Sequence, residues 1–183
     1  MQTTNKVPLP LLLLALVVSL VGCARTQSNP AARNTASPSA SPGSAASPVP
    51  KQITPADLAR LRWIEGTWRG TGGGVAPFFE RYKFENDSTL LVESFKDETL
   101  KVSDVSRFQL KDGRFEGSDG ESGSVATALD DNSITFAPTG KARNSFRFQR
   151  VSDNSWKAVL NWTENGVAKE RVYEMERFTA KTP

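Results

Sequence analysis

The C-terminal part of the sequence holds two side chains that together could bind an anion. Arg171 and Tyr173 are two residues apart, so on a β-strand both would lie on the same face. A guanidinium donates paired hydrogen bonds to a carboxylate or a similar group, and a phenol adds a further donor. The pair is therefore a candidate site for the anionic head of a ligand. In the alternative arrangement, Arg171 faces solvent or packs on Trp68, and Tyr173 belongs to the core.

Two neighbouring segments supply aromatic side chains that could line an apolar cavity. Trp156 and Trp162 are separated by an even number of residues, and so are Phe146 and Phe148. On strands each pair would therefore share a face. Aromatic walls with few polar groups are typical of pockets for small apolar molecules. They are equally typical of a small barrel packed with side chains, and both interpretations stay open.

Other kinds of chemistry have weaker support. The sequence has no histidine, which excludes nucleophiles activated by imidazole and haem or zinc sites that use histidine ligands. Glu80, Glu93 and Glu174 could be combined into a carboxylate pair for glycoside hydrolysis, but with 20 acidic residues in the chain some pairing is inevitable. We therefore predict no catalytic, metal or cofactor site, and an enzyme using carboxylates or tyrosine is kept as an alternative.

The first 22 residues have the pattern of a secretory signal. An apolar run from Val7 to Val21 follows Lys6, and it is shorter than the roughly 20 residues that span a bilayer core. The run ends in Leu20-Val21-Gly22-Cys23, which resembles the lipobox of bacterial lipoproteins. That resemblance implies cleavage before Cys23 and acylation of this cysteine, with chains such as palmitate. The alternative is an ordinary signal peptide that happens to contain a cysteine.

Lipidation of Cys23 would anchor the mature protein to a membrane of the cell envelope. The residue after it is Ala24, where lipoproteins retained in the inner membrane commonly have aspartate. The resemblance therefore implies the periplasmic face of the outer membrane if the organism is Gram-negative.

Residues 23–52 consist of the cysteine and a segment rich in serine, proline and alanine without apolar periodicity. Such a composition predicts a disordered tether, which would hold the domain at roughly 30 Å from the anchor. The folded domain is expected over residues 53–180. The chain has a net charge of +3, but this domain carries 18 basic and 20 acidic residues, so it lacks the basic surface that nucleic acids require.

The domain is predicted to begin with a short helix and to continue as strands. Thr54-Pro55-Ala56-Asp57 has the cap, proline and acidic residue of a helix start. After Gly66, nine turn signals separate about ten short segments with alternating apolar residues. Short connections favour an all-β, up-and-down antiparallel sheet, and closure into a barrel would remove its exposed edges. A β-sandwich is the structural alternative.

The sequence between the helix and the first strand carries a family resemblance. Gly66-Thr67-Trp68 resembles the Gly-x-Trp signature of the calycin superfamily, which includes lipocalins, fatty-acid-binding proteins, avidins and nitrobindin-like proteins. The resemblance implies that Trp68 closes one end of the barrel under a basic side chain from the last strand, either Arg177 or Arg171. Arg171-x-Tyr173 is also similar to the pair with which fatty-acid-binding proteins hold a carboxylate. Nitrobindins bind haem through a histidine, which this chain lacks, so the resemblance implies no haem.

These observations predict a lipid-anchored, monomeric envelope protein that binds a small hydrophobic or amphipathic molecule without catalysis. It would need no cofactor and bind no nucleic acid. The alternative is a filled barrel whose outer surface docks a protein partner of the envelope. The ligand-binding candidates are Arg171, Tyr173, Trp156, Trp162, Phe146 and Phe148.

Overall fold

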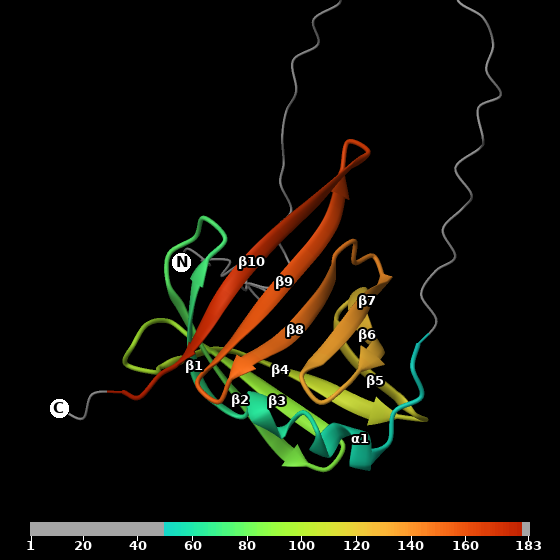
Figure 1. The fold of residues 1–183 in the computed structure, drawn as a ribbon, viewed down its shortest axis with the longest axis horizontal. Coiled ribbons are helices and arrows are strands. Elements are labelled where there is room, and N and C mark those ends of the chain that lie inside the picture. Colours follow the sequence, from blue (N-terminus) through green and yellow to red (C-terminus); the bar gives the residue numbers. More distant parts are fainter. Residues whose placement is uncertain (1–49, 181–183) are drawn as a thin grey trace, which may run out of the picture.

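A closed β-barrel of ten antiparallel strands accounts for most of residues 50–180, the part of the chain that this computed structural model describes (Figure 1). Each strand lies beside its neighbours in sequence, and the last strand pairs with the first. The predicted up-and-down barrel is therefore confirmed, and the β-sandwich alternative is excluded. The predicted signal peptide, Cys23 and all but the last residues of the tether lie outside the described residues.

Short turns join the strands, as the turn signals predict. The strands are β1 (Gly66–Gly72), β2 (Phe78–Asn86), β3 (Thr89–Phe95), β4 (Val102–Lys111), β5 (Arg114–Asp119), β6 (Ser122–Leu129), β7 (Ser133–Gly140), β8 (Ser145–Ser152), β9 (Ser155–Glu164) and β10 (Val167–Arg177). Asp112-Gly113 and Asn165-Gly166 both adopt positive φ at both residues, which two-residue hairpin turns require.

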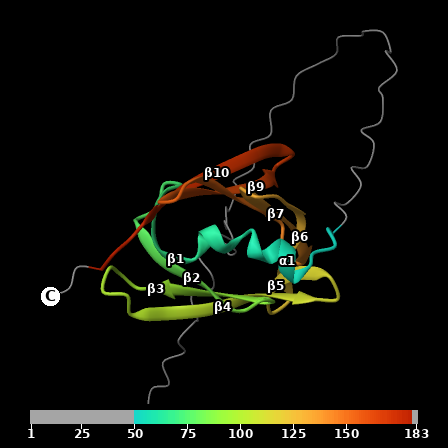
Figure 2. The same cartoon turned by 60° about the horizontal axis from the view of Figure 1, so that its bottom comes forward.

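A short helical segment covers one end of the barrel. It consists of α1 (Pro55–Ala59) and the 3₁₀ helix η1 (Arg62–Ile64), and Figure 2 shows it lying across the barrel opening. The backbone N–H of Asp57 donates to the Thr54 hydroxyl, and the Asp57 carboxylate accepts from the Thr54 backbone in return. Helices this short are not stable alone in water. The burial of Leu58, Leu61 and Ile64 therefore holds the segment in place.

We call the end under this helix the closed end. The opposite end, where the turns 73–77, 96–101, 120–121, 141–144 and 165–166 lie, is the mouth. The chain enters at the side of the closed end, where the backbone N–H of Lys51 donates to the carbonyl of Ala126 and that of Ile53 to the carbonyl of Gly113. Between residues 50 and 180, no helix is long and apolar enough to cross a membrane.

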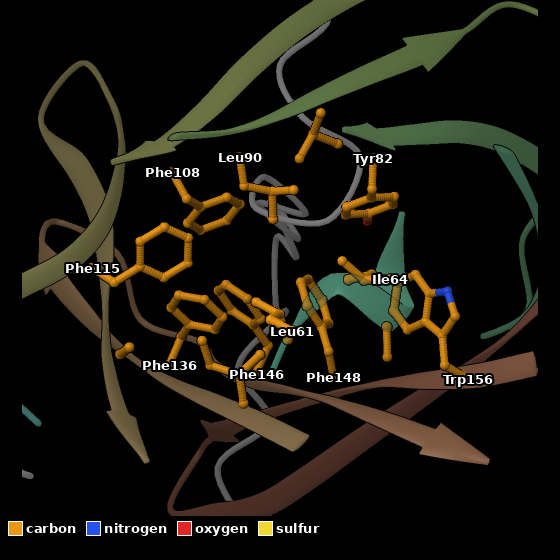
Figure 3. Packing of buried hydrophobic residues seen from close by; sticks show 14 of the residues in the cluster. Leu61, Ile64, Tyr82, Leu90, Phe108, Phe115, Phe136, Phe146, Phe148 and Trp156 are labelled. Atoms are coloured by element: carbon orange, nitrogen blue, oxygen red, sulfur yellow. The ribbon is translucent and has the colours of Figure 1, made fainter. Parts of the chain in front are cut away.

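Aromatic rings meet across the interior on the side of the closed end (Figure 3). Phe108 of β4 lies 5.0 Å from Phe136 of β7 and 6.3 Å from Phe146 of β8, measured between ring centroids. Tyr82 of β2 lies 6.1 Å from Phe148 of β8. These strands are not neighbours in the sheet, so the rings join opposite walls. This half of the barrel is filled with side chains.

Candidate functional site

The closed end is sealed by a stacked pair of side chains. Trp68 of β1 pairs in register with Arg177 of β10, and the guanidinium carbon lies 4.2 Å from the centre of the indole. The indole N–H donates to the carbonyl of Ile64 at 2.7 Å, and Arg177 donates to the carbonyl of Glu65 at 3.0 Å. These bonds fix the helix to the first and last strands. Of the two arginines considered from the sequence, Arg177 is the one that covers Trp68.

Arg171 lies further along β10, towards the mouth. Its side chain is half-buried, and its guanidinium carbon lies 5.6 Å from the ring centre of Trp162 on β9. No acidic side chain among residues 50–180 lies within ion-pair distance of it, so the charge has no partner in the described part of the chain. Tyr173 alternates with buried Met175 on the inner face of β10 and is only 3% exposed. Its ring meets Phe78 edge to face, with centroids 5.5 Å apart.

A glycine loop lies against these two side chains. Gly72, Gly73 and Gly74 have φ values of 96°, 61° and 73°, in the region that favours glycine. A Cβ at Gly73 would stand 2.5 Å from Cε1 of Tyr173 and 2.9 Å from Cδ of Arg171. The loop 73–77 therefore covers part of the mouth and touches both candidate side chains.

The other predicted lining residues divide between the mouth and the core. Phe146, Phe148 and Trp156 are 4%, 3% and 0% exposed. They pack against one another and against core rings, with Phe148 and Trp156 centroids 5.0 Å apart. Trp162 is half-buried and lies beside Arg171. Arg171 and Trp162 therefore lie together towards the mouth, whereas the other three belong to the packed core, and Tyr173 joins the two groups because it is as buried as Phe148 and touches the glycine loop. That any of the six contacts a ligand stays a prediction.

The three glutamates considered for catalysis do not come together. Glu93 forms an ion pair with Arg81, and Glu174 forms one with Lys157. Glu80 is instead directed into the barrel and is only 1% exposed. No group of three or more acidic or cysteine side chains within residues 50–180 is arranged to hold a metal ion.

Sequence reasoning missed the environment of Glu80. The Tyr82 hydroxyl donates to Oε2 of Glu80 at 2.7 Å, and burial raises the pKa of this carboxyl to about 7 despite that hydrogen bond. Burial, together with the neighbouring carboxylate, also raises the pKa of Tyr82. The signal was the alternation Phe78, Glu80, Tyr82, Phe84, which places an acid on the apolar face of its strand.

Two serine hydroxyls inside the barrel also went unnoticed in the sequence. The Oγ atoms of Ser106 on β4 and Ser124 on β6 are buried and lack a hydrogen-bond partner among the described residues. Both residues line a cavity of about 20 Å³, together with Phe108 and Gly117. Ser124 lies in a run of small residues, Ser122-Gly123-Ser124, and Ser106 lies between Val105 and Arg107, so neither context shows in the sequence that the hydroxyl points inward.

The sequence matches no protein-family model and no curated protein. Among solved structures, the fluorescent protein UnaG is 13% identical and has a TM-score of 0.44, and the match covers 64% of this chain and 99% of that one. A protein of unknown function from the DUF3598 family of Nostoc punctiforme is also 13% identical, with a TM-score of 0.43 and coverage of 75% and 53%. EF1p2_mFAP2b, in a structure bound to DFHBI, is 12% identical, with a TM-score of 0.35 and coverage of 65% and 97%.

These likenesses concern the fold alone. The topology of the chain itself is a closed up-and-down barrel that begins with a short helix and Gly66-Thr67-Trp68 and closes by pairing of β10 with β1.

Proposed function

We propose that the protein is a non-catalytic binding module that holds a small amphipathic molecule at the mouth of its barrel. The observation that carries this proposal is Arg171. The Arg171 residue is half-buried, with its Cδ against the glycine loop and its guanidinium carbon near the ring of Trp162, at the end that the helix leaves uncovered, and it has no acidic partner within residues 50–180. Withdrawing a cation from water without a counter-charge is costly. A ligand with an anionic group would offset that cost through charge-assisted hydrogen bonds.

The apolar part of the ligand would contact the rings around Arg171. Trp162, Tyr173 and Phe78 present aromatic surface there, and the ring of Phe78 lies over Gly70, where a Cβ would come within 2.2 Å of it. Ligand pockets commonly have volumes of about 300 Å³ or more, far above the cavity of about 20 Å³ inside this barrel. Displacement of the loop 73–77 and of the Phe78 ring would give the ligand more room beside Arg171.

A fluorescence titration with 8-anilinonaphthalene-1-sulfonate tests this proposal, because the probe combines a sulfonate with an aromatic body. The described domain should bind it saturably, and Arg171→Gln should weaken binding at least tenfold. Arg69→Gln is the matched control, since Arg69 is also half-buried but lies on the outer face of β1. The probe also binds loosely packed proteins, so near-UV circular dichroism must show that both variants are folded. Equal affinity of the two variants would refute the role of Arg171.

We also propose that the protein is attached to a membrane of the cell envelope through lipid on Cys23, on the periplasmic face of the outer membrane in a Gram-negative organism. The lipobox-like sequence Leu20-Val21-Gly22-Cys23 supports this proposal. Mass spectrometry of the mature N-terminal peptide should show an acylated cysteine. Cys23→Ser should transfer the protein from the membrane fraction to the soluble fraction. An unmodified cysteine within a longer mature chain would contradict the anchor.

The filled interior favours a second candidate, a barrel that docks a protein partner through its outer surface. The rings of Phe136 and Phe146 stack at 4.6 Å, so side chains fill the interior at this level. Native mass spectrometry of the protein purified from its own envelope separates the two candidates. A bound small molecule supports the binding module, whereas a co-purifying protein without a small molecule supports the docking role.

A further inference from the structure

The packing of the fold does not explain why Ser106 and Ser124 carry hydroxyl groups. Ser124 is 2% exposed, and neither Oγ atom has a hydrogen-bond partner among the described residues. A buried hydroxyl without a partner costs roughly 1–3 kcal/mol. Alanine at either position would avoid this cost, so the two hydroxyls call for a reason other than packing.

Both hydroxyls reach the same small space. Phe108 of β4 pairs with Gly117 of β5, and Gly117 pairs in turn with Ser124 of β6. The Phe108 ring lies directly over Gly117, where a Cβ would come within 2.9 Å of it. The missing side chain at Gly117 makes room for this ring, which forms one wall of the cavity. The cavity volume of about 20 Å³ is enough for one group of the size of a water molecule.

The chemistry of the cavity wall indicates which group would fit. A serine hydroxyl both donates and accepts hydrogen bonds but carries no charge to offset the desolvation of an ion. Arg107 also borders the cavity, but its guanidinium is engaged by Glu85 at 2.9 and 3.0 Å. Asp119, which borders the cavity too, is exposed and would repel an anion. A neutral hydroxyl or carbonyl satisfies these conditions.

Other polar side chains lie on the inner face of the strands beside the cavity. Glu80 of β2 pairs in register with Ser94 of β3, and Ser106 pairs with Val92 of the same strand. Glu80, Ser94, Ser106 and Ser124 thus lie on the inner face of β2, β3, β4 and β6, among apolar side chains such as those of Tyr82, Val92 and Phe108. The opposite wall carries Phe146, Leu160 and Tyr173 on β8, β9 and β10. A molecule entering at the mouth would therefore meet hydrogen-bonding groups as well as apolar side chains.

We propose that Ser106 and Ser124 form a polar subsite that binds one neutral hydrogen-bonding group, a hydroxyl or a carbonyl, at the end of the ligand furthest from Arg171. This inference rests on the proposed function and adds the class of ligand. The ligand is an amphipathic molecule with an anionic group at one end and an uncharged polar group at the other.

A matched pair of probes tests the subsite. Decanoate and 10-hydroxydecanoate differ by one terminal hydroxyl, and each can be measured by displacement of 8-anilinonaphthalene-1-sulfonate. We expect the hydroxylated acid to bind about 2–10-fold more tightly, the range expected for one net hydrogen bond. The double variant Ser106→Ala/Ser124→Ala should abolish this preference and leave the affinity for decanoate within about twofold. Ser145→Ala, on the outer face of β8, is the control and should keep the preference.

The same double variant gives a second readout that needs no ligand. Removing two unpartnered buried hydroxyls should raise the melting temperature of the free protein, by a few degrees for a domain of this size. A lower melting temperature would assign the hydroxyls to a structural role and overturn the proposal.

Failure of the subsite can be distinguished from failure of the proposed function. Equal affinities of the unmodified protein for the two acids, or a preference that survives in the double variant, would overturn the subsite alone. Arg171→Gln should weaken the binding of both acids by the same factor and leave their ratio unchanged. If neither the acids nor the fluorescent probe bind the unmodified protein, both the proposed function and the subsite are wrong.

Discussion

The two ends of this barrel use similar side chains for different purposes. At the closed end, Arg177 stacks on Trp68 and donates hydrogen bonds to the carbonyls of Glu65 and Asp153. At the mouth, Arg171 lies near Trp162 but has no carboxylate or carbonyl partner among the described residues. An arginine and a tryptophan thus close one end of the barrel. At the mouth, the guanidinium of the second such pair has hydrogen-bond donors without a partner among the described residues. An unused donor beside aromatic surface is what a binding site requires.

The contrast extends to the segments that cover each end. The helix at the closed end buries Leu58, Leu61 and Ile64, whereas the mouth is covered by a loop whose first residues are glycines with positive φ. Two indole N–H groups at the closed end, those of Trp63 and Trp156, also lack hydrogen-bond partners within residues 50–180, but they lie among packed rings. Burial of apolar side chains by the covering segment is therefore a feature of the closed end, and segments with few such contacts open at a lower free energy.

The largest expected effect compares two tryptophans of one strand. Trp156→Ala removes a fully buried ring from the closed-end core and should lower the free energy of unfolding by about 3–5 kcal/mol. Trp162→Ala removes a half-buried ring at the mouth and should cost about 1 kcal/mol. Urea denaturation measures both. Equal losses would show that the mouth is as tightly packed as the closed end. Probe binding should follow the opposite order, with Trp162→Ala binding more weakly.

The next effect concerns Glu80, which lies on the inner wall. Its pKa rises from 4.5 in the unfolded chain to about 7 in the folded protein. Folding therefore favours the protonated form of Glu80. The contribution of this form to the free energy of unfolding is complete below about pH 4.5 and is lost as the pH rises through 7. The free energy of unfolding should fall by about 3 kcal/mol across this window. Glu80→Gln, which stays uncharged, should remove this fall when urea denaturation is measured between pH 5 and 8.

Tyr82→Phe refines the same measurement. The hydrogen bond from Tyr82 lowers the pKa of Glu80, so its removal should move the midpoint of the pH dependence upward. The carboxyls whose pKa values are lowered, such as Asp57 and Glu85, titrate below this window and do not contribute to it. If the free energy of unfolding of Glu80→Gln falls with pH as steeply as that of the unmodified protein, Glu80 is not the titrating group.

A smaller difference is expected between the two arginines of β10. Arg177→Gln loses the contact with Trp68 and the bonds to two carbonyls, and should lower the free energy of unfolding by about 1–2 kcal/mol. Arg171→Gln should leave the stability unchanged or slightly raised, because its charge has no partner among the described residues. Thermal unfolding followed by circular dichroism checks both. A larger loss in Arg171→Gln would mean that this arginine supports the fold.

The smallest effect separates two adjacent glycines of the mouth loop. Gly73→Ala and Gly74→Ala both place a side chain at positive φ and should each cost about 1 kcal/mol. Only the Cβ at Gly73 meets Tyr173 and Arg171, since nothing lies within 4 Å of a Cβ at Gly74. Probe binding should therefore weaken in Gly73→Ala and remain close to normal in Gly74→Ala. Equal binding by the two variants would separate the loop from the site.

The fold could be predicted because its signals are local. The cap at Thr54, the alternating apolar residues and the hairpin turns at Asp112-Gly113 and Asn165-Gly166 each depend on a few adjacent residues. Because a closed barrel leaves no strand edge unpaired, the meander was predicted to close into a barrel. The spacing of Arg171 and Tyr173 likewise indicated that both would share a face, and in the structure both lie at the mouth.

The division between the core and the mouth depended on contacts that the sequence does not encode locally. Residue spacing placed Trp156 and Trp162 on one face, but only their position along the barrel puts one under the helix and the other at the opening. Phe146 meets Phe108 across the interior. This contact depends on how completely side chains fill the barrel, and that filling results from all ten strands together.

By itself, the sequence determined a ten-stranded barrel with a helical start, because turn chemistry and side-chain alternation act over short distances. Tertiary structure alone decided that Glu80 is buried beside Tyr82 and that the hydroxyls of Ser106 and Ser124 share a cavity. Strand register brings together residues from β2 to β6 that are far apart in the chain. The sequence around a polar side chain does not show which neighbours that side chain will meet. Its hydrogen bonds and its pKa are set only when the barrel closes.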